Sequence, residues 1–104
     1  MDEARVEARD LLREIKAAVD VPLVLHGGSS NPDDEIAESV RRGINKINIS
    51  CDIKVSYHQA MREVLRDTGL REPLIIQPPA VEAMKVTAAQ KIDLFEAAGR
   101  ADLY

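Results

Sequence analysis

Two short polar segments of this sequence carry the side chains best suited to chemistry. Segment 26–30 reads His-Gly-Gly-Ser-Ser after an apolar run, and segment 48–52 reads Asn-Ile-Ser-Cys-Asp at the end of a second, shorter run. Glycines let backbone N–H groups approach an anion closely, serine hydroxyls add donors, and an imidazole can ligate a metal. This composition predicts a phosphate cradle beside a metal ligand, while a plain flexible turn and a hydrogen-bonded structural histidine are the alternatives.

The elements around these segments alternate between helices and strands. The apolar spacing of Val6, Leu11, Leu12, Ile15 and Val19 predicts an amphipathic helix over 3–19. The continuous apolar run 21–25 indicates a strand covered on both faces, as in parallel sheets. A second helix is expected from Asn31 as N-cap, with Pro32 at its first position, to Gly43.

The second half of the chain repeats this pattern and then becomes helical. Segment 44–50 predicts a short strand, and Asp52 is expected to cap a third helix. Prolines at 73, 78 and 79 interrupt the pattern, and a last helix is expected over about 80–98. This order implies parallel strands with crossover helices, so both polar segments are expected at the carboxyl ends of strands, where α/β folds bind ligands.

Composition excludes several classes of protein. The chain has 104 residues, enough for one domain, and a net charge of −4, which gives no basic excess for a nucleic acid. No run of 18 apolar residues is present, so we expect no membrane span. The N-terminus is acidic rather than basic and apolar, and one cysteine cannot form an internal disulfide; we therefore expect a cytoplasmic protein.

The paired motifs resemble a specific family. "VPLVLHGGSS" followed by "GINKINISCD" is similar to the seventh and eighth strand ends of the class II, zinc-dependent ketose-bisphosphate aldolases, and "AVEAMKVTAAQKIDLFEAAGRA" is similar to their C-terminal helix. The resemblance implies that residues 1–104 are a single α/β piece, the C-terminal part of a (β/α)₈ TIM barrel. About two βα units plus terminal helices would be present, incomplete as an isolated barrel, since a full barrel takes roughly 250 residues.

The resemblance also implies a role for each polar segment. The family cleaves fructose or tagatose 1,6-bisphosphate reversibly to dihydroxyacetone phosphate and an aldehyde, with Zn²⁺ polarising the substrate oxygens and carboxylates elsewhere handling protons. His26 matches the last of three zinc-ligating histidines, and Asn48 matches the residue that contacts the ketone and hydroxyl end of the substrate. The phosphate-binding loops, one of them often beside a monovalent cation (Na⁺ or K⁺), match Gly27, Gly28 and Ser29 and then Ile49, Ser50 and Cys51.

Some positions depart from the family pattern. Ser30 replaces a commoner glycine, and Cys51 replaces a threonine hydroxyl, with a thiol that is a poorer donor. Zinc catalysis needs about three protein ligands, but the chain has two histidines, and His58 is expected on a helix surface or in a core.

The further zinc ligands and the catalytic carboxylates are therefore expected upstream of Met1. We predict no catalytic residue in this chain and no activity of the chain alone. The alternative is a non-catalytic partial barrel that self-associates, with residual phosphate binding; a homo-oligomer is expected in either case.

Overall fold

A computed structural model describes the backbone of residues 2–103 and the side chains of residues 10–103, so the prediction for Val6 lies outside the described side chains. The elements are α1 (Asp2–Ala18), β1 (Leu23–Leu25), the 3₁₀ turn η1 (Gly28–Ser30), α2 (Asp33–Arg41), β2 (Ile44–Ile47), α3 (Cys51–Val64), α4 (Pro73–Leu94) and a second 3₁₀ turn, η2 (Ala101–Leu103). The predicted order of helices and strands is confirmed.

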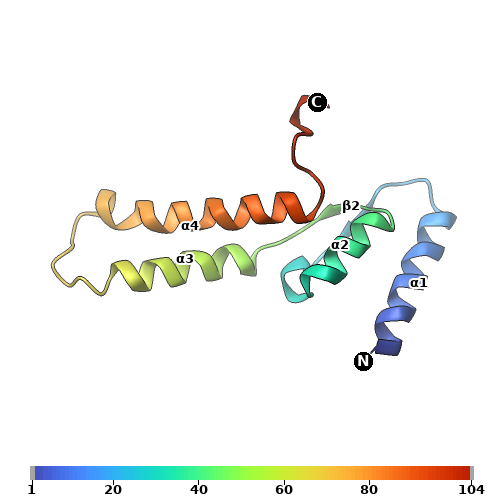
Figure 1. The fold of residues 1–104 in the computed structure, drawn as a ribbon, viewed down its shortest axis with the longest axis horizontal. Coiled ribbons are helices and arrows are strands. Elements are labelled where there is room, and N and C mark those ends of the chain that lie inside the picture. Colours follow the sequence, from blue (N-terminus) through green and yellow to red (C-terminus); the bar gives the residue numbers. More distant parts are fainter. Residues whose placement is uncertain (1, 104) are drawn as a thin grey trace.

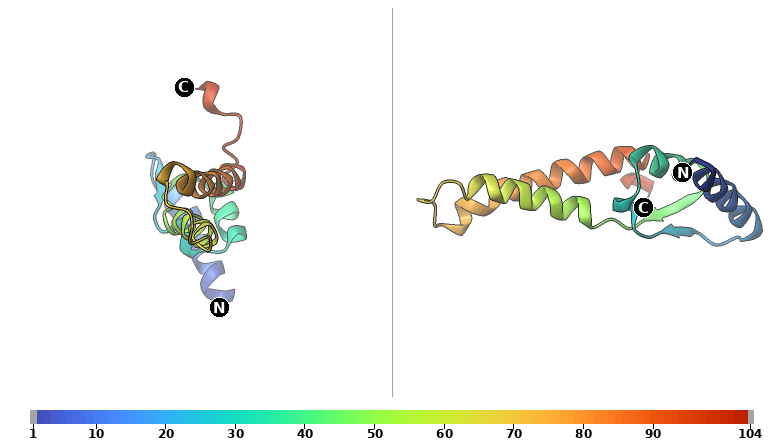
Figure 2. Two further views of the ribbon diagram at one scale, coloured as in Figure 1. Left: turned by 90° about the vertical axis from the view of Figure 1, so that its left-hand side faces the viewer. Right: turned by 90° about the horizontal axis from the view of Figure 1, so that it is seen from below.

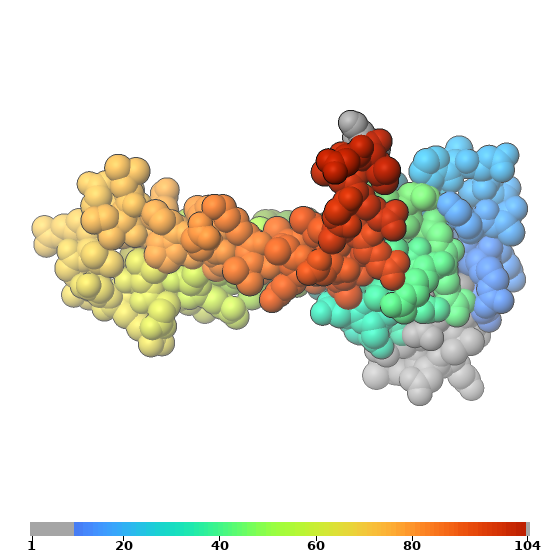
Figure 3. Space-filling model, turned by 45° about the horizontal axis from the view of Figure 1, so that its top comes forward, coloured from blue at the N-terminus to red at the C-terminus, as the bar shows by residue number. Residues whose placement is uncertain are grey.

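The molecule is long and flat, with principal extents of 58 × 38 × 17 Å. At one end, α1 and α2 lie beside the two strands; at the other, α3 and α4 form an antiparallel hairpin that projects away from them (Figures 1 and 2). The space-filling view shows the hairpin as an arm narrower than the end that carries the strands (Figure 3).

The two strands form a parallel pair, as the alternation of elements predicted. Leu23 pairs with Ile44, Val24 with Lys46 and Leu25 with Ile47, with an irregularity between the first two pairs. At that irregularity the side-chain oxygen Oδ1 of Asn45 accepts the backbone N–H of Leu23 at 3.0 Å. Both strands are shorter than the predicted ranges 21–25 and 44–50, although one further ladder bond joins Asn48 N–H to Leu25 O at 2.9 Å.

Two helices, α2 and α3, have a different N-cap residue from the one that the sequence predicted. Asn31 does not cap α2: Pro32 takes the N-cap position, and the Asn31 amide instead donates to Gly27 O at 3.1 Å. Asp52 does not cap α3 either, because Ser50 holds that position and Asp52 lies in the first turn. The N-cap lies one residue after the predicted cap in α2 and two residues before it in α3.

The last helix starts earlier than predicted. It begins at Pro73, with the Glu72 side chain accepting the N–H of Leu74 at 3.3 Å, and it includes Pro78 and Pro79 before ending at Leu94 rather than near residue 98. A proline inside a helix removes one backbone hydrogen bond and normally bends or ends it. Here the loss falls near the start of a helix that packs along α3, and the packing maintains the helix (Figure 1).

The hydrophobic core of the described residues is small. Ile36 of α2 and Ala80 of α4 are its buried apolar residues, at 2% and 0% exposure. Ile36 packs near Leu25 and Ile44, so α2 covers one face of the strand pair. The opposite face is open, because Val24 and Lys46 are exposed, as is Val21 just before β1. Two strands alone therefore leave one face of segment 21–25 uncovered, as expected for an incomplete barrel.

Two adjacent glycines follow β1 for different physical reasons. Gly27 has φ of +68°, a left-handed conformation that favours glycine. Gly28 is buried against β2, where an added Cβ would lie 2.6 Å from Ile47 Cγ2. The first glycine makes the turn, and the second lets the loop approach the neighbouring strand.

We predict that Gly28→Ala lowers the free energy of unfolding by about 1–3 kcal/mol, because the methyl group overpacks the contact with Ile47. Urea unfolding followed by circular dichroism measures the change. Gly69→Ala is the matched control: its added methyl would meet only the Asp67 side chain, at 3.2 Å, so we expect a change within about 0.5 kcal/mol. Equal stability of the two variants would contradict the close approach of Gly28 to β2.

Candidate functional site

The two polar segments meet at the carboxyl ends of β1 and β2. Between them lies an open hollow of about 200 Å³, whose lining residues come from both segments: Gly27, Ser29, Ser30, Asn48, Ile49, Ser50 and Cys51. The parallel pairing of the strands brings these segments to one edge of the sheet. Of the predicted site residues, His26 and Gly28 lie outside this lining.

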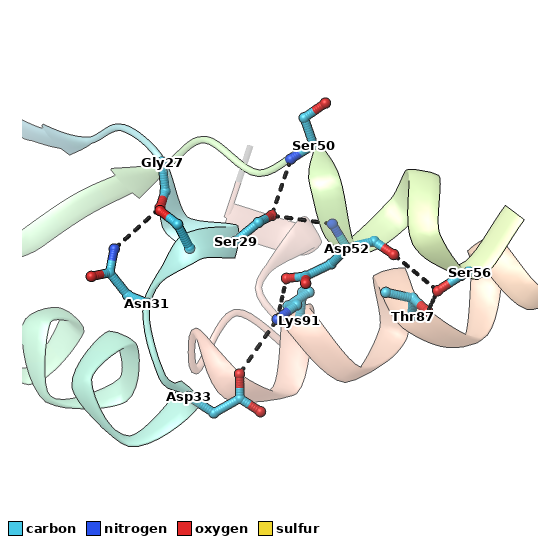
Figure 4. A network of polar contacts seen from close by, with 10 residues as sticks. Gly27, Ser29, Asn31, Asp33, Ser50, Asp52, Ser56, Thr87 and Lys91 are labelled. Carbon is cyan, nitrogen blue, oxygen red and sulfur yellow. Dashed lines mark hydrogen bonds and ion pairs between the residues drawn. The ribbon is translucent and has the colours of Figure 1, made fainter. Parts of the chain in front are cut away.

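The Ser29 hydroxyl joins the two segments directly. Its Oγ accepts the backbone N–H of Ser50 at 3.3 Å and that of Asp52 at 3.4 Å (Figure 4). The first amides of a helix have no partner within the helix, so a hydroxyl from the other loop completes the start of α3. An anion at a helix N-terminus accepts hydrogen bonds from the same kind of backbone groups. Ser29 thus marks a position where N–H groups converge on an oxygen acceptor.

The loop that carries Ser29 closes on one carbonyl. Gly27 O accepts the Ser30 N–H at 3.1 Å, the Ser30 hydroxyl at 2.8 Å and the Asn31 amide at 3.1 Å. Ser30, which stands where the family commonly has glycine, thus stabilises the turn through the hydrogen bond from its hydroxyl to Gly27 O. Gly28 donates its N–H to Asn48 O at 3.0 Å, which gives it a role in pairing and packing rather than in lining the hollow.

His26 and Asn48 lie side by side next to the hollow. The Asn48 amide nitrogen is 2.9 Å from His26 Nδ1, and Lys46 Nζ contacts the Asn48 carbonyl oxygen Oδ1. A lysine ammonium only donates, so the Asn48 oxygen faces Lys46 and its amide nitrogen donates to the histidine. His26 Nδ1 is then the acceptor, and the ring proton lies on Nε2. Lys46 was missed as a site residue, although residues two apart on a strand share one face.

The described residues do not by themselves fit a zinc site. No group of three histidine, cysteine, aspartate or glutamate side chains in this part of the chain is arranged to hold a metal, whereas catalytic zinc takes about three protein ligands. His58 is exposed on α3, where its ring contacts the Tyr57 ring edge-on, with centroids 5.9 Å apart. Of the two expected positions for His58, a helix surface or a core, the structure shows the first.

A lysine lies behind the hollow, at the junction of three helices. Lys91 Nζ of α4 is 2.7 Å from Asp52 Oδ2 and 3.4 Å from Asp33 Oδ1, and its side chain is 15% exposed (Figure 4). The hydrogen bond to Asp52, helped by the charges of both aspartates, raises the pKa of Lys91 above its usual value, although burial acts in the opposite direction. Nothing in the sequence spacing pointed to this residue, because its partners lie on two distant helices.

Among the helices that the structure describes, none combines the length and apolar character needed to cross a membrane.

The chain belongs to the class II fructose-bisphosphate aldolase family. The sequence model of that family matches residues 4–100, nearly the whole chain.

The individual relatives are aldolases. The chain is 37% identical to the 6-phospho-5-dehydro-2-deoxy-D-gluconate aldolase of Bacillus licheniformis over 91 residues, which cover 86% of this chain and 31% of that protein. It is 33% identical to the fructose-bisphosphate aldolase of Streptococcus pyogenes over 105 residues, or 90% of this chain and 36% of that protein. The chain therefore spans about a third of the length of the curated relatives it matches.

Solved structures show the same fold. The crystal structure of the YdjI aldolase from Escherichia coli matches 88% of this chain and 34% of its own, with a TM-score of 0.79 and 33% identity. A putative fructose-1,6-biphosphate aldolase from Coccidioides immitis matches 92% of this chain and 36% of its own, with a TM-score of 0.78. At 24% identity the second likeness concerns the fold alone.

Proposed function

We propose that this chain supplies the phosphate-binding loops and one zinc ligand of a class II aldolase. The reaction is the reversible aldol cleavage of a ketose 1,6-bisphosphate to dihydroxyacetone phosphate and an aldehyde. One observation carries the proposal: both polar segments line a single hollow at the carboxyl ends of two parallel strands, and backbone N–H groups there already converge on the Ser29 hydroxyl.

Within this site, the residues take separate roles. The substrate phosphate lies in the hollow, against the Gly27–Ser29 turn and the start of α3 at Ser50 and Cys51, where helix N–H groups and the helix dipole favour an anion. Asn48 contacts the ketone and hydroxyl end, with its amide oxygen held by Lys46. His26, exposed at the end of β1, is the zinc ligand: Nδ1, which accepts from Asn48 here, carries the lone pair that would bind the metal, so zinc takes the place of that hydrogen bond.

The remainder of the site belongs to other strands of a (β/α)₈ barrel, of which this chain is the C-terminal part. Three observations support this assignment: the parallel β1–β2 pair joined through α2, the open face that carries Val24 and Lys46, and the likeness to aldolase structures about three times as long. The other zinc ligands and the proton-transferring carboxylates come from those strands. The 104-residue chain alone is therefore inactive.

The relatives suggest which part of the substrate these loops bind. One relative's name gives a sugar acid with a ketone next to a phosphorylated carbon, and the other's gives fructose bisphosphate. A phosphate beside a ketone is common to both, and it is the dihydroxyacetone phosphate portion. The loops of this chain recognise that portion, while the rest of the substrate is read elsewhere.

We predict that dihydroxyacetone phosphate binds to the purified chain and shifts the amide resonances of residues 27–30 and 48–52 in a saturable way. Dihydroxyacetone without phosphate should leave them unchanged at the same concentration. Ser29→Ala should weaken binding roughly threefold to tenfold, because it removes a hydroxyl from the hollow. Ser39→Ala, on α2 with its hydroxyl bonded to Ile36 O, is the matched control. Shifts confined to other residues, or equal affinity of Ser29→Ala and wild type, would contradict the proposed site.

We also predict that the chain takes up far less than one equivalent of Zn²⁺ and does not cleave fructose 1,6-bisphosphate, since His26 is not grouped with two further ligands among the described residues. Metal analysis after dialysis and a coupled assay for dihydroxyacetone phosphate measure both quantities. Tight one-to-one zinc binding together with aldol cleavage would show that the site is complete within these residues and overturn this part of the proposal.

A further inference from the structure

Lys91 contacts the starts of both helices that follow the polar segments. Asp33 lies in the first turn of α2, just after segment 26–30, and Asp52 lies in the first turn of α3, at the end of segment 48–52. Lys91 comes from the last turn of α4 and reaches both carboxylates, at 3.4 Å and 2.7 Å (Figure 4). A single ammonium thus connects three helices behind the hollow.

Asp52 connects this lysine to the hollow itself. Its carboxylate pairs with Lys91, and its backbone N–H donates to Ser29 Oγ at 3.4 Å. The position of Asp52 is therefore fixed from two sides, by α4 behind it and by the other loop in front. Asp52 and Ser29 belong to different segments, so a shift of the start of α3 away from Ser29 changes the distance between the two segments that line the hollow.

Burial distinguishes this contact from the other lysine pair on α4. The Lys91 side chain is 15% exposed and that of Asp52 is 32% exposed, whereas Lys85 and Glu82 are each 68% exposed at 3.0 Å. Exposed pairs contribute little, because water screens them and long side chains lose freedom. A shielded pair with close geometry resists displacement much more strongly.

A second contact keeps α4 in register with α3. The hydroxyls of Ser56 and Thr87 hydrogen-bond to each other one helical turn along from the Lys91–Asp52 pair (Figure 4). Ser56 also donates to Asp52 O at 3.0 Å. The start of α3 is thus held against α4 by two neighbouring polar contacts.

We propose that Lys91 is a positioning residue for the phosphate site: it fixes the start of α3 through the shielded Asp52, whose N–H contacts Ser29 of the other loop, and so holds both loops around one phosphate group. The contact with Asp33, which is 74% exposed, adds a weaker link to the start of α2. This inference rests on the proposed function of the loops as a phosphate site, and it adds a residue on α4 that does not line the hollow. A purely electrostatic role is the competing account, in which Lys91 merely offsets the negative charge of the aspartates near the anion.

The test compares five forms of the full 104-residue chain: wild type, Lys91→Met, Lys91→Arg, Asp52→Asn and, as matched control, Lys85→Met. Two quantities are measured on each by NMR: the dissociation constant for inorganic phosphate, and the hydrogen-exchange rates of the Ser50 and Asp52 amides. The exchange rates need no ligand and report directly on the contact with Ser29.

We expect Lys91→Met to weaken phosphate binding roughly tenfold and to accelerate exchange of both amides by a similar factor, since the lost contacts involve charged partners. Lys91→Arg keeps the positive charge and the hydrogen-bond donors, so its dissociation constant and exchange rates should stay within about threefold of the wild-type values. Lys85→Met should have the wild-type values of both quantities. Asp52→Asn should also weaken binding, because it removes the partner that Lys91 holds. The electrostatic account predicts the opposite sign for Asp52→Asn, as a negative charge near the anion is lost.

Specific results of these measurements would overturn the positioning role of Lys91. Unchanged exchange and unchanged phosphate affinity in folded Lys91→Met, or tighter binding by Asp52→Asn, would overturn the inference. If Lys91→Met does not fold, Lys91→Arg and Asp52→Asn carry the same comparison. If wild type does not bind phosphate, the proposed function fails, and the exchange rates of the two amides alone decide whether Lys91 positions the loops.

Discussion

The hydrogen bonds from the start of α3 to the Ser29 hydroxyl are the interaction on which the rest of the site depends. They join a turn after β1 to a helix after β2, and they do so at the edge where the two parallel strands end. The tight turn around Gly27 O places Ser29, and the contact of Gly28 with β2 brings that turn close enough. The hollow exists because these local constraints act together.

The same geometry explains how one short piece of chain can carry specific chemistry. The Lys46, Asn48 and His26 side chains form one line of hydrogen bonds on the open face of the strands. Lys91 supports the other side, where the helices begin. The hollow thus lies between the open, polar face of the strands and the ion-paired junction where the helices begin. The chain spans about a third of the length of its relatives. The hollow and its two polar borders are the part of the site that the described residues form.

Much of this arrangement could be predicted from the sequence, because it follows from local composition. Two glycines and two serines after an apolar strand indicate a loop, and a second polar segment at the end of the next parallel strand must lie at the same edge. The order of helices and strands followed from apolar spacing in the same way. The two segments do line one hollow.

Other features required the tertiary structure. Pro78 and Pro79 indicate a break, yet α4 continues through them because it packs along α3. Asn31 and Asp52 are favoured caps, yet each makes a different contact, Asn31 with Gly27 O and Asp52 with Lys91. Lys91 itself is one of two lysines on α4, and only the meeting of three helices distinguishes it from Lys85. The positions of helix caps and ion pairs depend on which segments meet in the folded chain. The spacing of residue types along the sequence does not predict these meetings.

The central claim is that the two polar segments form one phosphate site rather than two separate turns. A crystal structure of the chain grown with inorganic phosphate tests this most directly. The account predicts one phosphate in the hollow, within hydrogen-bond distance of the Gly27–Ser29 turn and of backbone N–H groups at the start of α3. A phosphate that contacts only one segment, or that lies away from the hollow, would contradict it.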